Sequence, residues 1–329
     1  MNNLSTQAPA FCLVLALAAC GGGGSGTPAP AAGTSPADVP AAAATTTPAV
    51  VDNPVDVSSA VADTADAADP TEPAVAEPNP PATASSPGTS CAVAGNTDVL
   101  GGLRFQTSHR INAHDYGCLI VRKDQGHPVF DGAESARFEV RPADCSASAS
   151  FDDCKQDRSR HEINETTLEP TSGSTLVYTT RLFIPEQERF KPRGRNTLFL
   201  TQINFVDGAG LYGTLAYLEV ADNGDLLVRT DKDFTFGIKA QYPVYQKPFG
   251  KWIKVMWEIR STPAADGYLR VYVDDVLRVN ESRATLPSAT ATNRLKIGIY
   301  NVFKSRASEP YANQVVYFDG IARTATPSR

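Results

Sequence analysis

Basic residues are absent from the first part of the sequence, where no lysine or arginine precedes Arg104. Residues 21–90 instead hold eight Asp or Glu residues and 12 of the chain's 24 prolines. The formal net charge of −6 therefore belongs to this segment, and the rest of the chain is near +2. These counts exclude a strongly acidic globule and leave residues 91–329 for one folded domain.

The apolar run at 11–19 is too short to span a bilayer and has the length of a secretory signal's central region. It ends in Leu17-Ala18-Ala19-Cys20, which resembles the lipobox of bacterial lipoproteins. The resemblance implies a signal peptide at 1–19, lipidation of Cys20 and, because Gly21 follows rather than Asp, an anchor in the outer membrane, on its periplasmic or surface face. An ordinary cleaved signal is the alternative, and both imply export.

Residues 20–90 consist mainly of Gly, Ala, Pro, Thr, Ser and Asp. Such a segment cannot bury enough apolar surface to offset its chain entropy, and its prolines and like charges keep it extended. We expect a disordered tether that holds the domain away from the membrane.

Cysteines are few, and two of the six, Cys12 and Cys20, fall in the signal and the anchor. An even number remains in an exported chain, which suggests two disulfides. The four allow three pairings, of which we favour Cys91–Cys118 and Cys145–Cys154. No Cys-x-x-Cys pair supports a metal site, so we assign no metal and no cofactor.

Signatures of several other functions are missing as well. There is no Glu-x-Asp-x-x-Glu run of a jelly-roll glycoside hydrolase, no Gly-x-Ser-x-Gly of a serine hydrolase, and no basic run for nucleic acid. Asp274-Asp275 could be a calcium ligand pair, but a hairpin turn explains it better. We expect a monomer without a nucleic-acid partner.

Alternation of apolar and polar residues is abundant. It predicts strands at 176–184, 197–205, 213–220, 225–230, 251–260, 268–274, 294–300 and 315–319. Turn signals such as Asp266-Gly267 separate them, and no long segment has convincing helical spacing. So many antiparallel strands predict an all-β fold, a two-sheet β-jelly-roll sandwich of the concanavalin-like kind, with a concave substrate groove.

Two charged motifs could bind an anion. In Arg160-His161-Glu162 the first and third side chains share one face of a strand, and His161 points to the other. An arginine held by a neighbouring glutamate suits a carboxylate ligand, because the guanidinium fork matches two oxygens. Arg137-Phe-Glu-Val-Arg141 has the same pattern. A cross-strand ladder of ion pairs on a solvated sheet is the alternative.

Two further motifs follow. Gln202 and Asn204 share a strand face and could donate hydrogen bonds to a carboxylate, or could be the polar face of an edge strand. In the run 295–301, Lys296 and Tyr300 share a face with Gly298, whose missing side chain would let a sugar ring approach. A tyrosine beside a lysine loses its proton more easily, although Tyr300 could also simply pack on the sheet.

Together these motifs resemble the signature strands of the β-jelly-roll polysaccharide lyases. In the alginate lyase branch the order is Arg-Ser/Thr-Glu, Gln-Ile/Val-His, then Tyr-Phe-Lys-Ala-Gly-Val/Ile-Tyr-Asn, and the last motif is matched here at Lys296, Gly298, Tyr300 and Asn301. The runs 251–257 and 266–274, followed by 296–300, resemble the heparin-lyase-I-like and glucuronan lyase group. The resemblance covers roughly residues 100–325.

The resemblance implies β-elimination at a uronic acid of an anionic polysaccharide of glucuronan, alginate or glycosaminoglycan type. It requires neutralisation of the C6 carboxylate, a base for the C5 proton and an acid for the leaving O4. By motif, Arg160, Gln202 and Asn204 face the carboxylate and Tyr300 is the acid. Supporting substrate contacts are expected from the residues Lys296, Arg137, Glu162 and Asn301.

Asn204 stands where the family usually has His, and an amide cannot act as a base near neutral pH. Tyr300 could serve as both acid and base in a syn elimination. Alternatively another histidine acts, with His109, His114 and His127 as candidates and His161 disfavoured by its direction. The remaining alternative is a non-catalytic, lectin-like carbohydrate-binding lipoprotein.

Overall fold

The computed structural model describes residues 88–91, 100–107, 114–145, 147–148, 151–166, 171–185, 197–207, 211–234, 237–306 and 312–327. All of them belong to one compact unit, spanning residues 74–329. The expected signal peptide, the lipidation site and nearly all of the expected tether lie outside the described residues. Among the residues that are described, no helix has both the length and the apolar character to cross a membrane.

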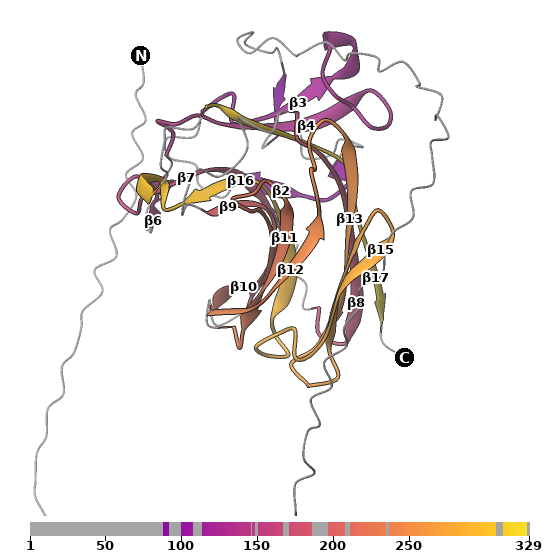
Figure 1. The fold of residues 1–329 in the computed structure, drawn as a ribbon. Coiled ribbons are helices and arrows are strands. Elements are labelled where there is room, and N and C mark those ends of the chain that lie inside the picture. The colour runs from indigo at the N-terminus through magenta and orange to yellow at the C-terminus, as the bar shows by residue number, and fades with distance from the viewer. Residues whose placement is uncertain are drawn as a thin grey trace, which may run out of the picture. The chain divides into compact units, whose positions relative to one another are not determined.

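Two antiparallel sheets make up the fold, as the alternation predicts (Figure 1). One sheet has the order β1 (Thr89–Ser90), β3 (Cys118–Arg122), β4 (Glu134–Val140), β17 (Gln314–Pro327), β8 (Ser174–Phe183), β13 (Trp252–Ser261), β14 (Tyr268–Val273) and β15 (Val276–Ser282). The other has the order β12 (Gly237–Tyr245), β11 (Leu226–Lys232), β10 (Tyr212–Val220), β9 (Thr197–Val206), β16 (Thr292–Val302), β7 (Arg158–Glu165) and β2 (Phe105–Thr107). The short strands β5 (Ala147–Ser148) and β6 (Phe151–Asp152) pair separately, and the 3₁₀ turns η2 (Lys123–Gln125) and η3 (Lys304–Arg306) complete the described elements.

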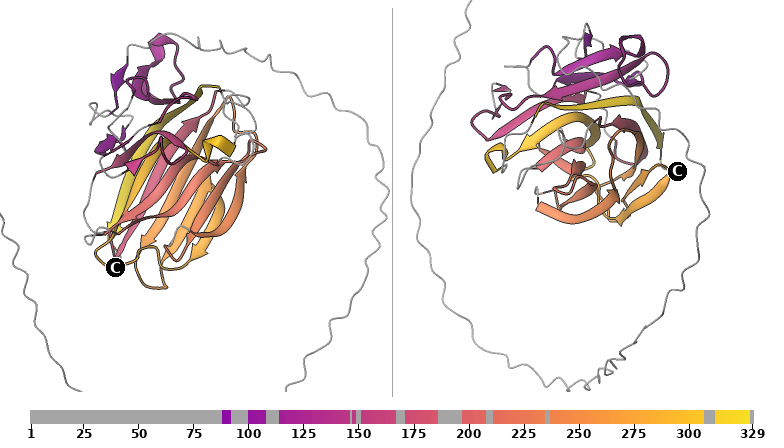
Figure 2. Two further views of the ribbon diagram at one scale, coloured as in Figure 1. Left: turned by 90° about the vertical axis from the view of Figure 1, so that its left-hand side faces the viewer. Right: turned by 45° about the horizontal axis from the view of Figure 1, so that its top comes forward.

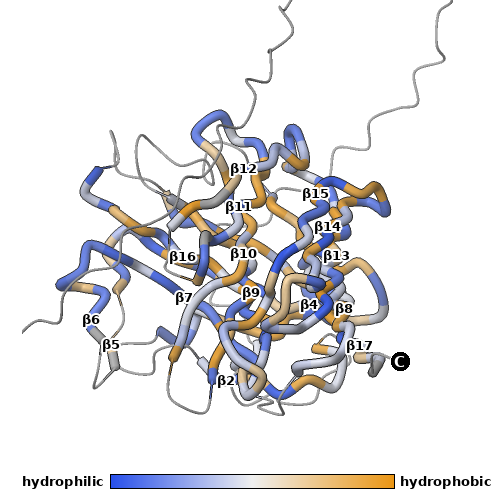
Figure 3. The backbone as a smooth tube through the Cα atoms, turned by 90° about the horizontal axis from the view of Figure 1, so that it is seen from below, coloured by the Kyte–Doolittle hydropathy of each residue, from blue (hydrophilic) through white to orange (hydrophobic). Residues whose placement is uncertain are grey.

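The hydrophobic core lies between the two sheets and is built by alternation. In β13 the side chains of Ile253, Val255, Trp257 and Ile259 are fully buried, and the residues between them are partly exposed. Hydrophobic and hydrophilic positions alternate in this way along many strands (Figure 3). Each large apolar side chain buried in this layer contributes about 1.5–3 kcal/mol, so the pattern fixes which face of every strand is left for function.

The seven-stranded sheet bends strongly, with its hollow side turned away from the strands β8 and β13 (Figure 1). Its long strands run side by side when seen from that hollow side (Figure 2). Register shifts in β9, against both β10 and β16, mark irregularities near the middle of the sheet. Such bulges bend a strand and re-aim its side chains, and they are common beside active sites.

Both favoured disulfides are confirmed: Cys91 is bonded to Cys118, and Cys145 to Cys154. The expected domain boundary is one strand too late, because Thr89 and Ser90 form β1 and pair with Ile120 and Leu119 of β3. Sheet structure therefore begins before Cys91, inside the segment expected to be tether.

Candidate active site

Three adjacent strands of the seven-stranded sheet bring the sequence motifs together. Strand β16 lies between β7 and β9, with Tyr300 opposite Arg160 and Lys296 opposite Gln202. Gly298 lies opposite Glu162. Because the neighbours of Tyr300 on β16, Ile297 and Ile299, point into the core, the polar residues project from the opposite, hollow face. The convergence expected from the sequence is thus present.

Glu162 is the centre of this group. Its carboxylate accepts a hydrogen bond from Gln202 Nε2 at 2.5 Å and lies 3.3 Å from Lys296 Nζ and 3.4 Å from Arg160 Nη1. All four side chains are buried, so the ion pairs are poorly screened. Glu162 therefore ties three strands together on the hollow face.

Arg160 is held mainly by a residue that sequence reasoning missed. Its Nε and Nη2 atoms each donate to a different oxygen of Asp153 at 2.7 Å. Burial alone would lower the pKa of Arg160, but Asp153 and Glu162 outweigh it and raise the pKa above its ordinary value. The guanidinium group that was expected to bind a substrate carboxylate is thus bound to Asp153. The one available signal was the position of Asp153 beside Cys154.

Tyr300 packs between a cation and an aromatic ring. The guanidinium carbon of Arg160 lies 3.7 Å from the centre of the Tyr300 ring, and the Phe199 ring lies 5.5 Å away. Burial raises the pKa of Tyr300 to about 12, although Arg160 and Arg158 oppose the shift. The expectation of a lowered pKa beside Lys296 is therefore wrong, because burial is the larger effect. At neutral pH Tyr300 is a proton donor.

An aromatic row continues from Tyr300 across the sheet. Phe199 on β9 lies 4.3 Å from Tyr217 on β10, ring centre to ring centre, and both side chains are partly exposed. Flat aromatic faces beside a proton donor are suited to stacking against sugar rings. The row is not predictable from strand alternation, because Phe199 and Gln202 are three residues apart and share a face only through the bulge in β9.

Asn204 is on the expected face but is fully buried. Its Nδ2 donates to Thr214 Oγ1 at 2.9 Å and to the carbonyl of Gly213 at 3.3 Å. In this arrangement the amide supports β10 rather than meeting a substrate carboxylate, which corrects the expected direct contact.

Two expected substrate contacts lie elsewhere. Asn301 points to the face opposite Tyr300 and donates to Gln314 Oε1 at 2.8 Å, so it joins the two sheets internally. Arg137 belongs to the other sheet, on β4, and alternates with the core residues Ala136 and Phe138. Neither residue lies beside Tyr300, because a sequence motif does not determine which face of which sheet a side chain occupies.

Comparison with known proteins assigns the family. The family model described as "Polysaccharide lyase" matches residues 122–322, which is more than half of the chain. The chain belongs to the polysaccharide lyase family. This polysaccharide lyase has no match among curated protein sequences.

Solved structures similar to this lyase are themselves described as lyases. An endo-β-1,4-glucuronan lyase from the fungus Trichoderma reesei is 14% identical, with 68% of this chain and 94% of that chain covered and a TM-score of 0.46. An alginate lyase of polysaccharide lyase family 7 is 14% identical, with 70% and 97% covered and a TM-score of 0.47. A marine alginate lyase from Aplysia kurodai is 9% identical, with 64% and 88% covered and a TM-score of 0.44.

The three described histidines lie apart from Tyr300. His161 points away from Arg160, as expected, and its ring packs against Gly117 and Asp144. His127 lies beside Tyr317, which clusters with Leu119 and Phe183 away from the main core. His114 lies beside Asp144, and His109 falls outside the described residues. Within the described residues, no histidine is hydrogen-bonded to the Tyr300 group.

Proposed function

We propose that this lyase cleaves a uronic-acid-containing polysaccharide, of glucuronan, alginate or glycosaminoglycan type, by β-elimination. One observation carries the proposal: a buried, protonated tyrosine lies against Arg160, on the same sheet face as Lys296 and Gln202. A carboxylate at C6 is what makes the C5 proton removable, and few other sugar units offer one. This chemistry suits a site built from hydrogen-bond donors around a proton donor.

The reaction needs a proton removed at C5 and another delivered at O4. The C5 proton passes to a base, for which we propose His109, because the three described histidines lie elsewhere. The electron pair of the C5–H bond forms the C4=C5 double bond, and the C4–O4 bond breaks, so O4 leaves with the electron pair of that bond. Tyr300 donates its phenolic proton to O4. Tyr300 is poorly placed to begin as the base, since a pKa of about 12 leaves only about one molecule in 10⁵ ionised at pH 7.

Substrate recognition falls to Lys296 and Gln202 in this proposal. A lysine ammonium carries three donors and a glutamine amide two, and Glu162 faces one group of each side chain. The remaining donors can neutralise the C6 carboxylate. Arg160, whose fork is occupied by Asp153, acts through its position against the Tyr300 ring and is a positioning residue.

The test uses the purified full chain on glucuronan, alginate and glycosaminoglycans, with products followed by the ultraviolet absorbance of the unsaturated uronate. We expect absorbance to rise with at least one polymer and to stay flat with its carboxyl-reduced form, which lacks the acidifying group. Binding without products on the whole panel would favour a lectin-like lipoprotein instead.

We also propose that the protein is an exported monomer, anchored in the outer membrane through lipid on Cys20. Residues 20–90 would form the tether between the anchor and the domain. The lipobox-like sequence Leu17-Ala18-Ala19-Cys20 supports the anchor. A Cys20→Ser variant should move from the membrane pellet to the soluble fraction. Retention in the pellet would argue against the anchor.

A further inference from the structure

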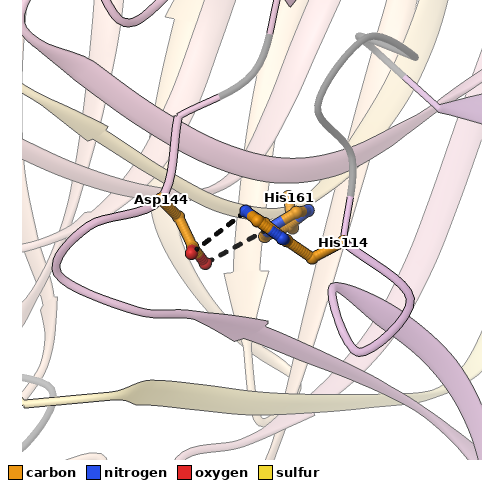
Figure 4. A group of neighbouring side chains, drawn as sticks. All are labelled: His114, Asp144 and His161. Atoms are coloured by element: carbon orange, nitrogen blue, oxygen red, sulfur yellow. Dashed lines mark ion pairs between the residues drawn. The ribbon is translucent and has the colours of Figure 1, made fainter.

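A second polar cluster consists of His114, Asp144 and His161 (Figure 4). His161 alternates with Arg160 along β7, so the cluster lies on the opposite face of that strand. His114 Nε2 lies 3.2 Å from one oxygen of the Asp144 carboxylate, and His161 Nε2 lies 3.4 Å from the other. The three ligand-type atoms lie within 4.8 Å of one another. His161 comes from β7, Asp144 from the segment after β4, and His114 from the segment before β3.

The carboxylate of Asp144 is fixed in place from outside the cluster. Tyr116 donates its hydroxyl to one oxygen at 2.6 Å, and the backbone amide of Arg141 donates to the other at 2.8 Å. The Arg141 guanidinium also covers the Tyr116 ring at 3.6 Å. A carboxylate has about four acceptor positions, so these two bonds leave the positions that face the histidines.

His161 is the part of the cluster that most needs a partner. Its side chain is 8% exposed, and its Nε2 makes no well-formed hydrogen bond within the described part of the chain, since the nearest Asp144 oxygen lies 3.4 Å away. The ring fits only because residue 117 is glycine: a Cβ there would lie 2.2 Å from His161 Nδ1. A buried imidazole nitrogen left without a hydrogen bond costs about 1–3 kcal/mol, so such an atom calls for a ligand.

We propose that His114, Asp144 and His161 bind one divalent transition-metal ion of the zinc type. A tetrahedral ion with bonds of about 2.1 Å separates its ligand atoms by about 3.4 Å. Each histidine Nε2 lies at nearly this distance from the nearer oxygen of the carboxylate. Two imidazoles and one carboxylate suit zinc, whereas calcium takes oxygen ligands almost exclusively. Tyr116 and Arg141 orient the carboxylate as outer-shell partners commonly do.

The ion would link three separate segments at one point. It would join β7 of the seven-stranded sheet to the segments that flank β3 and β4 of the other sheet. Asp144 precedes Cys145, whose disulfide partner Cys154 follows Asp153, the residue that holds Arg160. The site lies on the face of β7 opposite Arg160, so it is structural and separate from the proposed chemistry at Tyr300, and its test does not depend on lyase activity.

The experiment uses the full chain without an affinity tag, stripped with a chelator and dialysed against zinc. Elemental analysis should find one zinc per chain, and cobalt in its place should give the visible bands of a site of low symmetry. Millimolar calcium should not displace the zinc. Thermal unfolding of the loaded protein should shift upward relative to the stripped protein.

Variants separate the site from other metal binding. His114→Ala should abolish stoichiometric binding while the fold is retained, since His114 is 40% exposed. Tyr116→Phe keeps all three ligands and should weaken binding about 10–100-fold. His127→Ala, at a histidine outside the cluster, is the matched control and should bind zinc as the unmodified chain does.

Two results would overturn the proposal. One is the absence of stoichiometric zinc on the unmodified chain. The other is unchanged binding in both His114→Ala and Asp144→Asn. Circular dichroism of each variant shows that a loss of binding is not a loss of fold.

Discussion

At the scale of single residues, Glu162 is the side chain on which the site's geometry depends. Its carboxylate contacts Gln202, Lys296 and Arg160, from three strands, and all of these groups are buried. Removing one partner of a buried ionic network leaves the others desolvated without compensation. Glu162 is therefore more a support for the cations than a direct contact for the polymer.

Glu162→Gln should lower the free energy of unfolding by about 2–4 kcal/mol, because Lys296 loses its ion pair while Arg160 keeps Asp153. Urea unfolding measures this. Glu258→Gln is the control, since Glu258 pairs with the more exposed Arg270 and should change stability by less than about 1 kcal/mol. Equal losses in the two variants would contradict a central role for Glu162.

Tyr300 makes a prediction about pH. Its pKa of about 12 lies above the ordinary value near 10, because burial disfavours the phenolate. The neutral phenol therefore favours the folded state, and that contribution is constant below pH 10 and is lost as the pH rises from 10 towards 12. Tyrosinate absorbance, compared between the unmodified chain and Tyr300→Phe, should show no ionisation of Tyr300 below pH 10. Ionisation of this residue near pH 8 would refute the assignment as acid.

At the scale of elements, the close approach of β16 to β7 depends on Gly298. Its φ of +136° is a conformation that side chains rarely adopt, and a Cβ would lie 2.2 Å from the carbonyl oxygen of His161. Strand β16 therefore reaches β7 closely enough for Tyr300 to lie against Arg160 only with glycine at this point.

Gly298→Ala should destabilise the protein by at least about 2 kcal/mol more than Gly250→Ala. Gly250 also has a positive φ, of +70°, but a Cβ there meets nothing within 4 Å. Gly250→Ala therefore measures the cost of backbone strain without a steric clash. Thermal or urea unfolding of the two variants measures the difference. A similar loss in both would show that the contact with β7 is unimportant.

Alternation predicted most of the inner strands after residue 170, because each must bury one apolar side. The predicted ends lie within two residues of the observed ends for seven strands: β8, β9, β10, β11, β13, β14 and β16. For β17 the prediction stopped at residue 319, whereas the strand continues to Pro327. No range was predicted for β12 and β15, which are edge strands, or for any strand before β8. In β15 the apolar residues Val276 and Leu277 are exposed and the charged Glu281 is buried, so hydropathy does not report which side of the strand is buried.

The candidate site was predictable only as far as strand faces determine it. Arg160, Gln202, Lys296 and Tyr300 share a face because of their spacing along regular strands. The bond from Arg160 to Asp153 and the raised pKa of Tyr300 depend on packing between segments, which periodicity does not encode. The burial of Asn204 depends on the neighbouring strand β10 for the same reason.

At the scale of the whole molecule, the two disulfides differ in what they contribute to stability and to the side-chain clusters. Cys91–Cys118 joins residues 27 apart in sequence and fastens the first described strand, while Cys145–Cys154 joins residues only nine apart. In the chain-entropy account the longer loop gives the larger stabilisation. The second disulfide instead has Asp144 directly before Cys145 and Asp153 directly before Cys154, and each of the two carboxylates belongs to a different side-chain cluster.

Replacing Cys91 and Cys118 by Ser should cost about 3–4 kcal/mol of stability, and replacing Cys145 and Cys154 about 1 kcal/mol less. The second change should also impair catalysis by loosening Asp153 from Arg160. Unfolding curves and kcat/KM, measured on both double variants, test the two statements. A change in kcat/KM confined to the first variant would contradict them.

The account's central claim is that Tyr300 gives a proton to the leaving O4 on the face formed by β7, β9 and β16. The most direct measurement is kcat/KM of Tyr300→Phe on a polyuronate that the unmodified chain cleaves, alongside the affinity for that polymer. The account predicts a loss of about 10²–10⁴ in kcat/KM with affinity nearly unchanged. A variant that retains activity within about threefold of the unmodified lyase would contradict it.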